Sequence, residues 1–352
     1  MAVLTIDLNK LEHNARIIVQ KAAEANIDIY GVTKVLCGEP CVATAMLRAG
    51  VKGIADSRIE NLRELRNSGI AAPLMMLRLP AISEAEEVVR QADISLNSEY
   101  ATCVALSKFA VALRRVHKVI LMIDIGDLRE GIWPKDFPAL LEKTVLLPNL
   151  EVMGVGANFS CFGGVIPDHA NLSVLSSLAN HLSRRLGKKT ELSAGNSSSL
   201  SLLFDQQLPP EATNLRIGEG IILGRETINR IPIVGAYLDV CTLTAEVIEV
   251  QDKPSVPIGT IGQDAFGNVP RFENKGTQKR AILSIGRQDV VPEGIVPRLK
   301  GLAILGASSD HLILDITEAK QPIVVGDTLS FDVGYGALLA ASTSKYVKKE
   351  YI

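Results

Sequence analysis

Lys34 has the position in this sequence that is most typical of covalent chemistry. It ends the run Ile29-Tyr-Gly-Val-Thr-Lys34, and the chain then continues through Val-Leu-Cys to a break at Gly38. A strand covered on both faces is a continuous apolar run, so this segment predicts a buried strand with an ammonium at its carboxyl end. Burial lowers the pKa of an ammonium and makes the amine nucleophilic. Two interpretations are open: a lysine that forms a Schiff base, and a lysine whose ammonium extends to solvent.

Other polar side chains stand at the ends of predicted strands, as Lys34 does. Together these residues are Lys34, Arg78, Asn97, Asp124, Asn158, Asn196 and Arg216. The carboxyl ends of parallel strands meet at one face, and (β/α)8 barrels keep their active sites there. A single residue of this kind could be an ordinary loop residue, but the repeated placement predicts a site at this face.

The elements that must position these side chains alternate between helix and strand. An amphipathic helix over 7–23 precedes the Lys34 strand. The pattern then predicts strands at 53–56, 74–78, 94–97, 118–124, 151–158, 191–195 and 214–216, and helices at 40–49, 58–68, 84–91, 99–109, 138–144 and 171–186. Eight strands within about 200 residues, with helices between most of them, predict a closed parallel (β/α)8 TIM barrel. An open doubly wound sheet is the alternative.

After residue 225 the pattern changes to strands with few helices between them. The strand-like segments are 234–250, 280–285, 302–305, 312–316 and 328–331, and loops such as 259–268 carry turn residues. We therefore expect two domains, a barrel over 8–228 and a mostly β domain over 229–352. Residues 1–7 are expected to add one strand to the β domain.

Composition excludes several classes of protein. The chain has 352 residues, 47% hydrophobic and 22% charged, with a formal net charge of -2. This composition is ordinary for a globular enzyme, and no basic run suggests a nucleic-acid or membrane partner. No signal peptide or long apolar run is present, so we expect a cytoplasmic protein with a small-molecule substrate. The five cysteines are scattered and indicate reduced thiols, and we expect no metal site, since Cys37 and Cys41 lack further ligands nearby.

Several motifs together resemble one enzyme family. Tyr30-Gly-Val-Thr-Lys34, Gly156-Ala-Asn-Phe-Ser160, Asn196-Ser197 and Arg216-Ile-Gly218 are similar to the motifs of the alanine racemase fold of pyridoxal-phosphate enzymes. The resemblance covers nearly the whole chain and implies a barrel followed by a β domain. The segments Thr33-Lys-Val-Leu-Cys-Gly38, Leu215-Arg-Ile-Gly-Glu-Gly220 and Ile285-Gly-Arg-Gln-Asp289 are most similar to the ornithine racemase branch of the amino-acid racemases.

The resemblance implies pyridoxal 5'-phosphate as cofactor and assigns roles around it. Lys34 forms the Schiff base, Arg216 faces the pyridine nitrogen, and Arg129 faces the ring oxygen or the substrate carboxylate. The cofactor contacts also include Asn196, and the phosphate is held by Ser197, by N–H groups near Gly218 and by a tyrosine that is either Tyr335 or Tyr346.

Three departures from the family pattern change the expected site. Asn158 stands where alanine racemases have a histidine on the cofactor ring, and Gly286-Arg-Gln-Asp289 stands where they have a second catalytic tyrosine. The base on the opposite face of the substrate is therefore not assigned by the resemblance. The third departure is the loop 306–311, which is similar to a partner-subunit loop of ornithine decarboxylase.

In that loop Ser309 takes the place of the decarboxylase cysteine, and Asp310 takes the place of the carboxylate that binds the distal ammonium. Asp310 could instead be a simple turn aspartate. Asp289 is a further candidate for substrate binding, and His311 or Ser309 is a candidate for the missing proton relay near Cα.

We predict a racemase of a basic amino acid, ornithine or lysine, that acts as a homodimer with shared active sites. The alternatives are a decarboxylase of the same fold and a non-catalytic pyridoxal-phosphate carrier, which would lack the β domain. The residue at the ring nitrogen separates the two enzymes, because a guanidinium leaves that nitrogen neutral whereas a carboxylate keeps it protonated. Arg216 favours a racemase, although a shifted alignment would bring Glu219 to this position.

Overall fold

The computed structural model describes residues 2–352, and the chain divides into two compact units. The first unit is Leu8–Leu238. The second combines Asp239–Ile352 with the residues up to Asp7. Each unit has its own sheet, and the two are described separately below.

The first unit extends beyond residue 228, where we expected the barrel domain to end. Asn14 is a buried residue of the first helix, and it bonds to the last residues of the first unit. Its Nδ2 donates to the carbonyl of Tyr237 at 2.8 Å, and its Oδ1 accepts from the N–H of Tyr237 at 2.8 Å. These two hydrogen bonds attach the segment after residue 228 to the barrel unit.

The first unit alternates strand and helix as predicted. Its strands are β2 (Asp28–Val32), β3 (Gly53–Asp56), β4 (Leu74–Met76), β5 (Ile94–Asn97), β6 (His117–Met122), β7 (Leu150–Gly156), β8 (Glu191–Ser193) and β9 (Asn214–Ile217). Its helices are α1 (Leu8–Glu24), α2 (Pro40–Arg48), α3 (Ile59–Asn67), α4 (Ala85–Gln91), α5 (Tyr100–Ala112), α6 (Phe137–Thr144), α7 (His169–Leu186), α8 (Leu200–Phe204) and α9 (Glu219–Leu223). The short helices α8 and α9 were not predicted, because five residues are too few to show a helical period.

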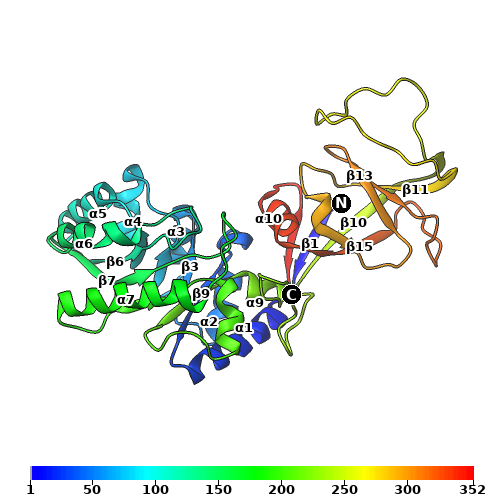
Figure 1. Ribbon diagram of the computed structural model, residues 1–352. Coiled ribbons are helices and arrows are strands. Elements are labelled where there is room, and N and C mark those ends of the chain that lie inside the picture. Colours follow the sequence, from blue (N-terminus) through cyan, green and yellow to red (C-terminus); the bar gives the residue numbers. More distant parts are fainter. Residues whose placement is uncertain (1) are drawn as a thin grey trace. The chain divides into compact units, whose positions relative to one another are not determined.

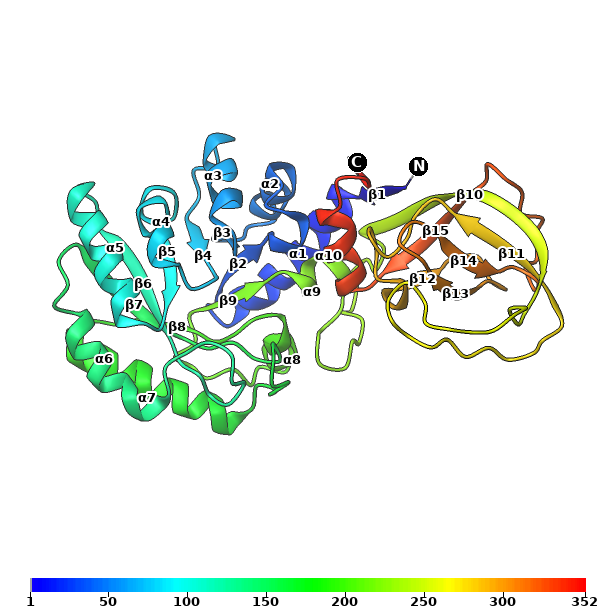
Figure 2. The ribbon, with the colours of Figure 1, turned by 90° about the horizontal axis from the view of Figure 1, so that it is seen from above.

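The eight strands close into a barrel in the order β2 to β9. β2 pairs with both β3 and β9 in parallel, which excludes the open doubly wound sheet. Alternate strand residues point inward and fill the barrel, among them Tyr30, Met75, Leu96 and Met122. The helices surround the strands (Figure 1, Figure 2). All eight carboxyl ends therefore open at one face, where the predicted site residues of the barrel unit lie.

Local sequence explains the helices that cover the barrel. α1 buries Leu11, Ala15 and Ile18 at helical spacing on one side. α7 is capped by Asp168, whose side chain accepts from the N–H of Asn171 at 2.8 Å. These apolar stripes account for the packing of the helices against the sheet.

The second unit is a sheet with one α-helix among its described residues. Its strands are β1 (Val3–Ile6), β10 (Cys241–Pro254), β11 (Thr277–Leu283), β12 (Ile295–Pro297), β13 (Ala303–Ala307), β14 (Leu312–Asp315), β15 (Thr328–Val333) and β16 (Lys348–Tyr351), and its helix is α10 (Tyr335–Thr343). The sheet order is β12-β15-β10-β11-β14-β13, with β1 beside β10 and β16. These pairs are antiparallel except β1 with β16.

Two predictions for the β domain need comment. The added strand from the start of the chain is confirmed, since β1 pairs with β10 from Val3 opposite Thr244 to Ile6 opposite Cys241. The strand predicted from residue 234 is wrong at its start, because the chain turns at Gly235, whose φ is +81°, and β10 begins only at Cys241. The helix α10 was missed because its small apolar residues show no polar face.

Candidate active site

Lys34 lies at the mouth of the barrel, two residues beyond the end of β2. The hydroxyl of Thr33 donates to the buried carboxylate of Asp56 at 2.8 Å, and Lys34 begins a 3-10 turn that ends at Leu36. A lysine after this apolar run was expected in the interior or at the strand's mouth, and because the strand ends at Val32 and the lysine side chain is exposed, Lys34 stands at the mouth. The position at the strand's mouth agrees with a lysine that receives a ligand from outside.

Arg216 is the most deeply buried charged side chain of the predicted site, at 2% exposed. It lies on β9 beside Tyr30 of β2, whose side chain fills the barrel. Its Nη1 donates to the hydroxyl of Ser193, and its Nη2 donates to the carbonyl of Ala157 at 2.6 Å and to Oδ1 of Asn158 at 2.8 Å. All three acceptors are neutral, and burial lowers the pKa of Arg216 to about 10.

The guanidinium of Arg216 keeps donors available for a ligand. A guanidinium has five N–H donors, and three of them are used in these hydrogen bonds. Within residues 2–352 the remaining two, on Nε and Nη1, have no hydrogen-bond partner. Arg216 therefore presents donors to an acceptor such as an unprotonated ring nitrogen.

Asn158 connects Arg216 to the loop that carries Arg129. Its Nδ2 donates to Oε1 of Glu130 at 2.5 Å, and the same carboxylate oxygen accepts from Nη2 of Arg129 at 2.6 Å. The structure thus brings Arg129, Asn158 and Arg216 into one hydrogen-bonded group through Glu130. The departure at Asn158 replaces a ring-stacking histidine with an amide that bonds to charged neighbours.

The loops after β6 and β7 position these residues. Asp124 accepts from the N–H of Gly126 at 2.9 Å and closes the first loop, which returns at Gly131 with a φ of +135°. A Cβ at Gly131 would lie 2.3 Å from the N of Asp124, so only glycine fits this return. Arg129 and Glu130 lie immediately before it and are held over the barrel mouth.

Asp127 joins the two loops to each other. Its carboxylate, on a side chain 4% exposed, accepts from the N–H groups of Cys161 at 3.1 Å, Phe162 at 2.9 Å and Val165 at 3.2 Å. A single buried carboxylate thus organises the start of the β7 loop. Cys161 is thereby held near the predicted site, where its Sγ accepts from Nδ2 of Asn196 at 3.3 Å.

The predicted phosphate residues of the barrel also lie together. The hydroxyl of Ser197 accepts from the N–H of Gly220 at 3.1 Å, which connects the turn after β8 with the turn after β9. A Cβ at Gly218 would lie 3.0 Å from Cβ of Val32, so the β9 turn approaches the end of β2 closely. Ser197 and Gly218 therefore lie at the same side of the mouth as the Lys34 turn.

Glu219 is engaged outside the barrel centre. It begins α9, and its Oε1 accepts from Nη1 of Arg230 at 2.8 Å. Burial raises the pKa of Glu219, while Arg230 and the ammonium of Lys34 act in the opposite direction. Arg216, by contrast, points into the barrel. The structure therefore assigns the interior position to the arginine and not to the glutamate.

The two candidate tyrosines lie in the second unit. Tyr335 is the first residue of α10 and is half-buried. Tyr346 follows that helix and is 57% exposed, with the ammonium of Lys345 5.0 Å from its ring centroid. The choice between the two tyrosines stays a prediction.

The loop with Ser309, Asp310 and His311 connects β13 and β14, and all three residues are exposed. The hydroxyl of Ser309 donates to Oδ2 of Asp310 at 2.7 Å. A Cβ at Gly286 would lie 2.4 Å from the N of Asp310, so the loop packs directly on the segment that ends at Asp289.

Asp289 has a different environment from Asp310. It is buried, and its Oδ1 accepts from the hydroxyl of Ser344 at 2.6 Å. The carboxylate of Asp310 is therefore exposed to a ligand, whereas the carboxylate of Asp289 is buried and bonded to Ser344.

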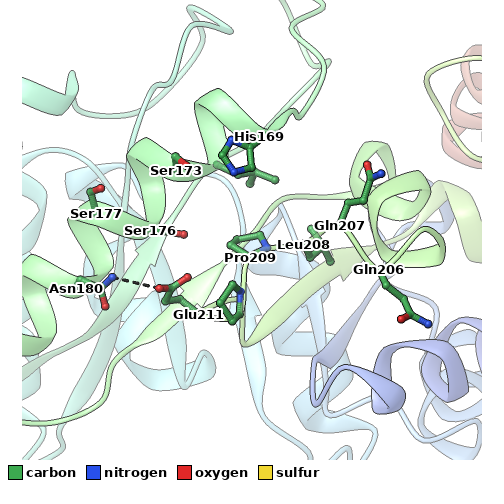
Figure 3. Close-up of a pocket in the computed structure, with 12 residues that line it drawn as sticks. His169, Ser173, Ser176, Ser177, Asn180, Gln206, Gln207, Leu208, Pro209 and Glu211 are labelled. Carbon is green, nitrogen blue, oxygen red and sulfur yellow. Dashed lines mark hydrogen bonds between the residues drawn. The ribbon is translucent and has the colours of Figure 1, made fainter.

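A pocket elsewhere on the barrel unit does not contain these residues. It has a volume of about 440 Å³ and lies between α7 and the segment 206–211 (Figure 3). Asn180 and Glu211 bond across it at 3.3 Å. None of the predicted site residues lines this pocket, so it is distinct from the site at the barrel mouth.

Sequence reasoning missed Asp127, Glu130 and Ser193. Each makes hydrogen bonds to predicted site residues or their loops, but each does so across elements distant in sequence. An acidic residue beside Arg129 was the one visible signal. The hydrogen-bond partners of Glu130 could be identified only once the barrel is closed.

Comparisons with known proteins agree with this geometry. The family model for the alanine racemase N-terminal domain matches residues 6–225. An ornithine racemase of Acetoanaerobium sticklandii is 43% identical over 351 residues, which cover 99% of each chain. A lysine racemase of Thermotoga maritima is 39% identical over 349 residues, which cover 99% of this chain and 98% of the relative.

Solved structures with the same fold include the alanine racemase of a D-cycloserine-producing Streptomyces lavendulae, with a TM-score of 0.79 and 18% identity over 100% of this chain and 97% of that one. The alanine racemase of Bartonella henselae, with covalently bound pyridoxal phosphate, has a TM-score of 0.75 and 18% identity, and the match covers 100% of this chain and 99% of that one. Within residues 2–352 no helix is long and apolar enough to cross a bilayer. The family model and the full-length relatives show that the chain belongs to the alanine racemase family, as its motifs predicted.

Proposed function

We propose that this protein is an isomerase, a racemase of basic amino acids that uses pyridoxal 5'-phosphate bound to Lys34. The cofactor supplies an electron sink for a carbanion at Cα of the amino acid. The residues present fit this group. An exposed lysine stands at the barrel mouth, and Arg216 on the neighbouring strand β9 offers two N–H donors that have no hydrogen-bond partner among residues 2–352.

The environment of Arg216 carries the proposal. Within the described part of the chain no carboxylate bonds to its guanidinium, and Glu219 is bound to Arg230. A guanidinium facing the ring nitrogen leaves that nitrogen unprotonated, because arginine does not give up its proton. This weakens delocalisation into the ring, which would disfavour the side reactions of a strongly delocalised carbanion and so suits a racemase. A decarboxylase of this fold would place a carboxylate there.

The remaining residues bind and orient. Ser197 and the N–H groups near Gly218 hold the phosphate, with Asn196 beside them and either Tyr335 or Tyr346 as a further donor. Support comes from the hydrogen bond that joins Ser197 to Gly220. Arg129, whose side chain is 39% exposed, orients the ring oxygen or the substrate carboxylate.

The substrate is proposed to be ornithine or lysine. Relatives at 43% and 39% identity over nearly the full chain are an ornithine racemase and a lysine racemase. Asp310 is an exposed carboxylate that could meet a distal ammonium, and Asp289 is a second candidate. Ser309 and His311 beside Asp310 are candidates for the proton relay on the face opposite Lys34.

We further propose a cytoplasmic homodimer in which the β unit of one subunit completes the barrel mouth of the other. Support comes from the exposure of Ser309, Asp310 and His311 in the single chain, because substrate-binding residues need a surface to face. A shared site of this kind follows the two-fold symmetry of most homodimers.

The test is to incubate the purified, cofactor-loaded protein with each L-amino acid. Chiral chromatography should show the D form of ornithine or lysine, with no release of CO₂. Released CO₂ with loss of the amino acid would identify the decarboxylase instead. Cofactor binding without turnover of any amino acid would identify a carrier.

A further inference from the structure

Glu130 is a carboxylate that the proposed function does not use. It stands in the loop after β6, and its side chain is 18% exposed. Its Oε1 accepts from Nη2 of Arg129 at 2.6 Å and from Nδ2 of Asn158 at 2.5 Å, while Oε2 bonds to Nε of Arg129. Both carboxylate oxygens are therefore engaged by side chains that the sequence motifs assign to the cofactor.

The hydrogen-bonded chain continues from Asn158 to the buried arginine. Oδ1 of Asn158 accepts from Nη2 of Arg216 at 2.8 Å, while Nδ2 of the same amide donates to Glu130. An amide can serve both neighbours at once because one end accepts and the other donates. Glu130 is thus bonded directly to Arg129 and, through one amide, to Arg216.

The charges explain why a carboxylate belongs at this point. One guanidinium, that of Arg129, lies on the loop after β6, and a second, that of Arg216, lies inside the barrel and bonds only to neutral acceptors. Burial disfavours the charged form of Arg216, the guanidinium of Arg129 adds to this effect, and the nearby carboxylate of Glu130 acts against it. The charged and titratable groups of the cluster that includes Glu130 are Arg129, Arg216, Asp127, Cys161 and Lys34.

We propose that Glu130 is a positioning residue of the active site. It holds Arg129 directly and Arg216 through Asn158, and its negative charge offsets one of the two guanidinium charges. This inference rests on the proposed function, because the two arginines meet a cofactor only if Lys34 binds one.

The first experiment compares Glu130→Gln with Glu142→Gln. Glu142 lies on α6 and pairs with Nε of Arg185 on α7 at 2.7 Å, so both changes remove one negative charge and one glutamate–arginine ion pair. The measurement is a pH titration of the visible absorption of the substrate-free, cofactor-loaded protein, which reports protonation of the nitrogen of Lys34. Removing the charge of Glu130 leaves the mouth more positive, which disfavours a protonated nitrogen.

We expect the midpoint of that titration to fall by about one pH unit in Glu130→Gln and to stay unchanged in Glu142→Gln. Glu130→Asp keeps the charge and should keep the wild-type midpoint. A Glu130→Gln protein that titrates as wild type overturns the inference while the proposed function stands. A wild-type protein that takes up no cofactor overturns both. If Glu130→Gln does not fold while Glu142→Gln does, a normal titration of a folded Glu130→Ala protein overturns the inference as well.

The second experiment tests the connection through Asn158. Equilibrium dialysis measures the Kd of the cofactor for Glu130→Gln, Asn158→Ala and the double variant. Residues that act through one chain of hydrogen bonds are not additive. We expect each single change to weaken binding roughly 10-fold, with little further loss in the double variant. A roughly 100-fold loss in the double variant would show that Glu130 and Asn158 act independently. It would overturn the proposal that Glu130 acts on Arg216 through Asn158.

The thermal stability of the same three variants is also compared in the cofactor-free protein. In the cofactor-free protein, Glu130→Gln and Asn158→Ala should each lower the Tm, and the double variant should lower it by less than the sum. A strictly additive fall in Tm contradicts the hydrogen-bonded connection from Glu130 through Asn158, whatever the activity of the loaded enzyme.

Discussion

Lys34 projects from a firmly held piece of main chain. Thr33 before it bonds to Asp56, and Val35 and Leu36 after it are buried, so the backbone is fixed while the lysine side chain is exposed. This arrangement suits a residue that carries a covalent group. Among residues of the site, Lys34 therefore has the most direct chemical test.

We predict that borohydride reduction of the cofactor-loaded protein attaches the cofactor to Lys34. Reduction converts an exchangeable C=N bond to a stable amine, and peptide mapping then locates it. Lys34→Ala should carry no adduct, whereas Lys52→Ala, which alters an exposed lysine paired with Asp28 at 3.5 Å, should be labelled as wild type. An adduct on a different lysine would refute the assignment.

Asp310 is the residue on which the choice of substrate is proposed to depend. Bringing a second ammonium into a partly closed site is costly unless a carboxylate meets it. Asp310→Ala should therefore lower kcat/KM for ornithine or lysine by roughly 30-fold or more, with little effect on alanine or serine. The control is Asp264→Ala, since Asp264 is a turn aspartate of the same unit that accepts from the N–H of Phe266 at 2.9 Å. Retained preference for basic amino acids in Asp310→Ala would show that Asp310 is only a turn residue.

At the scale of elements, the loops after β6 and β7 behave as one structure because Asp127 joins them. Its carboxylate satisfies three backbone N–H groups of residues 161–165. Hydrogen bonds to charged groups are stronger than neutral ones, and amides left without an acceptor are costly. The loops that hold Arg129 and Asn158 thus depend on a residue that has no predicted contact with the cofactor.

We predict that Asp127→Ala lowers the free energy of unfolding by about 3 kcal/mol and weakens cofactor binding as well. Urea denaturation and cofactor titration measure the two effects. Asp168→Ala, which removes the N-cap of α7, should cost about 1 kcal/mol and leave cofactor binding unchanged. If Asp127→Ala lost stability but bound cofactor normally, the connection between the loops after β6 and β7 would not be required for cofactor binding.

At the scale of the whole molecule, the proposed site draws on both units. Lys34 and Arg216 belong to the first unit, and Asp310 and the candidate tyrosines belong to the second. A shared homodimer predicts complementation between subunits. The Lys34→Ala and Asp310→Ala proteins should each be nearly inactive on ornithine or lysine when alone.

After subunit exchange the mixture should recover roughly a quarter of wild-type activity, because half of the dimers are hybrids and each hybrid has one intact site of two. Mixed-mass native mass spectrometry verifies the exchange. Verified hybrids without recovered activity would mean that each site is built within one chain.

The confirmed predictions rest on local signals. Alternating helix and strand patterns, with Lys34 near the end of the first barrel strand, were enough to predict the (β/α)8 barrel, because each barrel unit repeats the same short pattern. The strand formed by the start of the chain was also predicted, since Val3–Ile6 precedes the first barrel helix. The exact end of the first strand was not, because Val35 and Leu36 after Lys34 continue the apolar pattern while the chain already turns into a 3-10 helix.

What the sequence by itself determined was the family and the barrel, because short motifs and periodicity are local properties of the chain; the cofactor residues that these motifs name stay predictions. Only the tertiary structure decided which charges face each other. It separated Arg216 inside the barrel from Glu219 bound to Arg230, and it linked Glu130 to Arg216 through Asn158. The physical reason is that such pairings depend on the closure of eight strands, which brings residues 58 positions apart, Asn158 and Arg216, within hydrogen-bond distance.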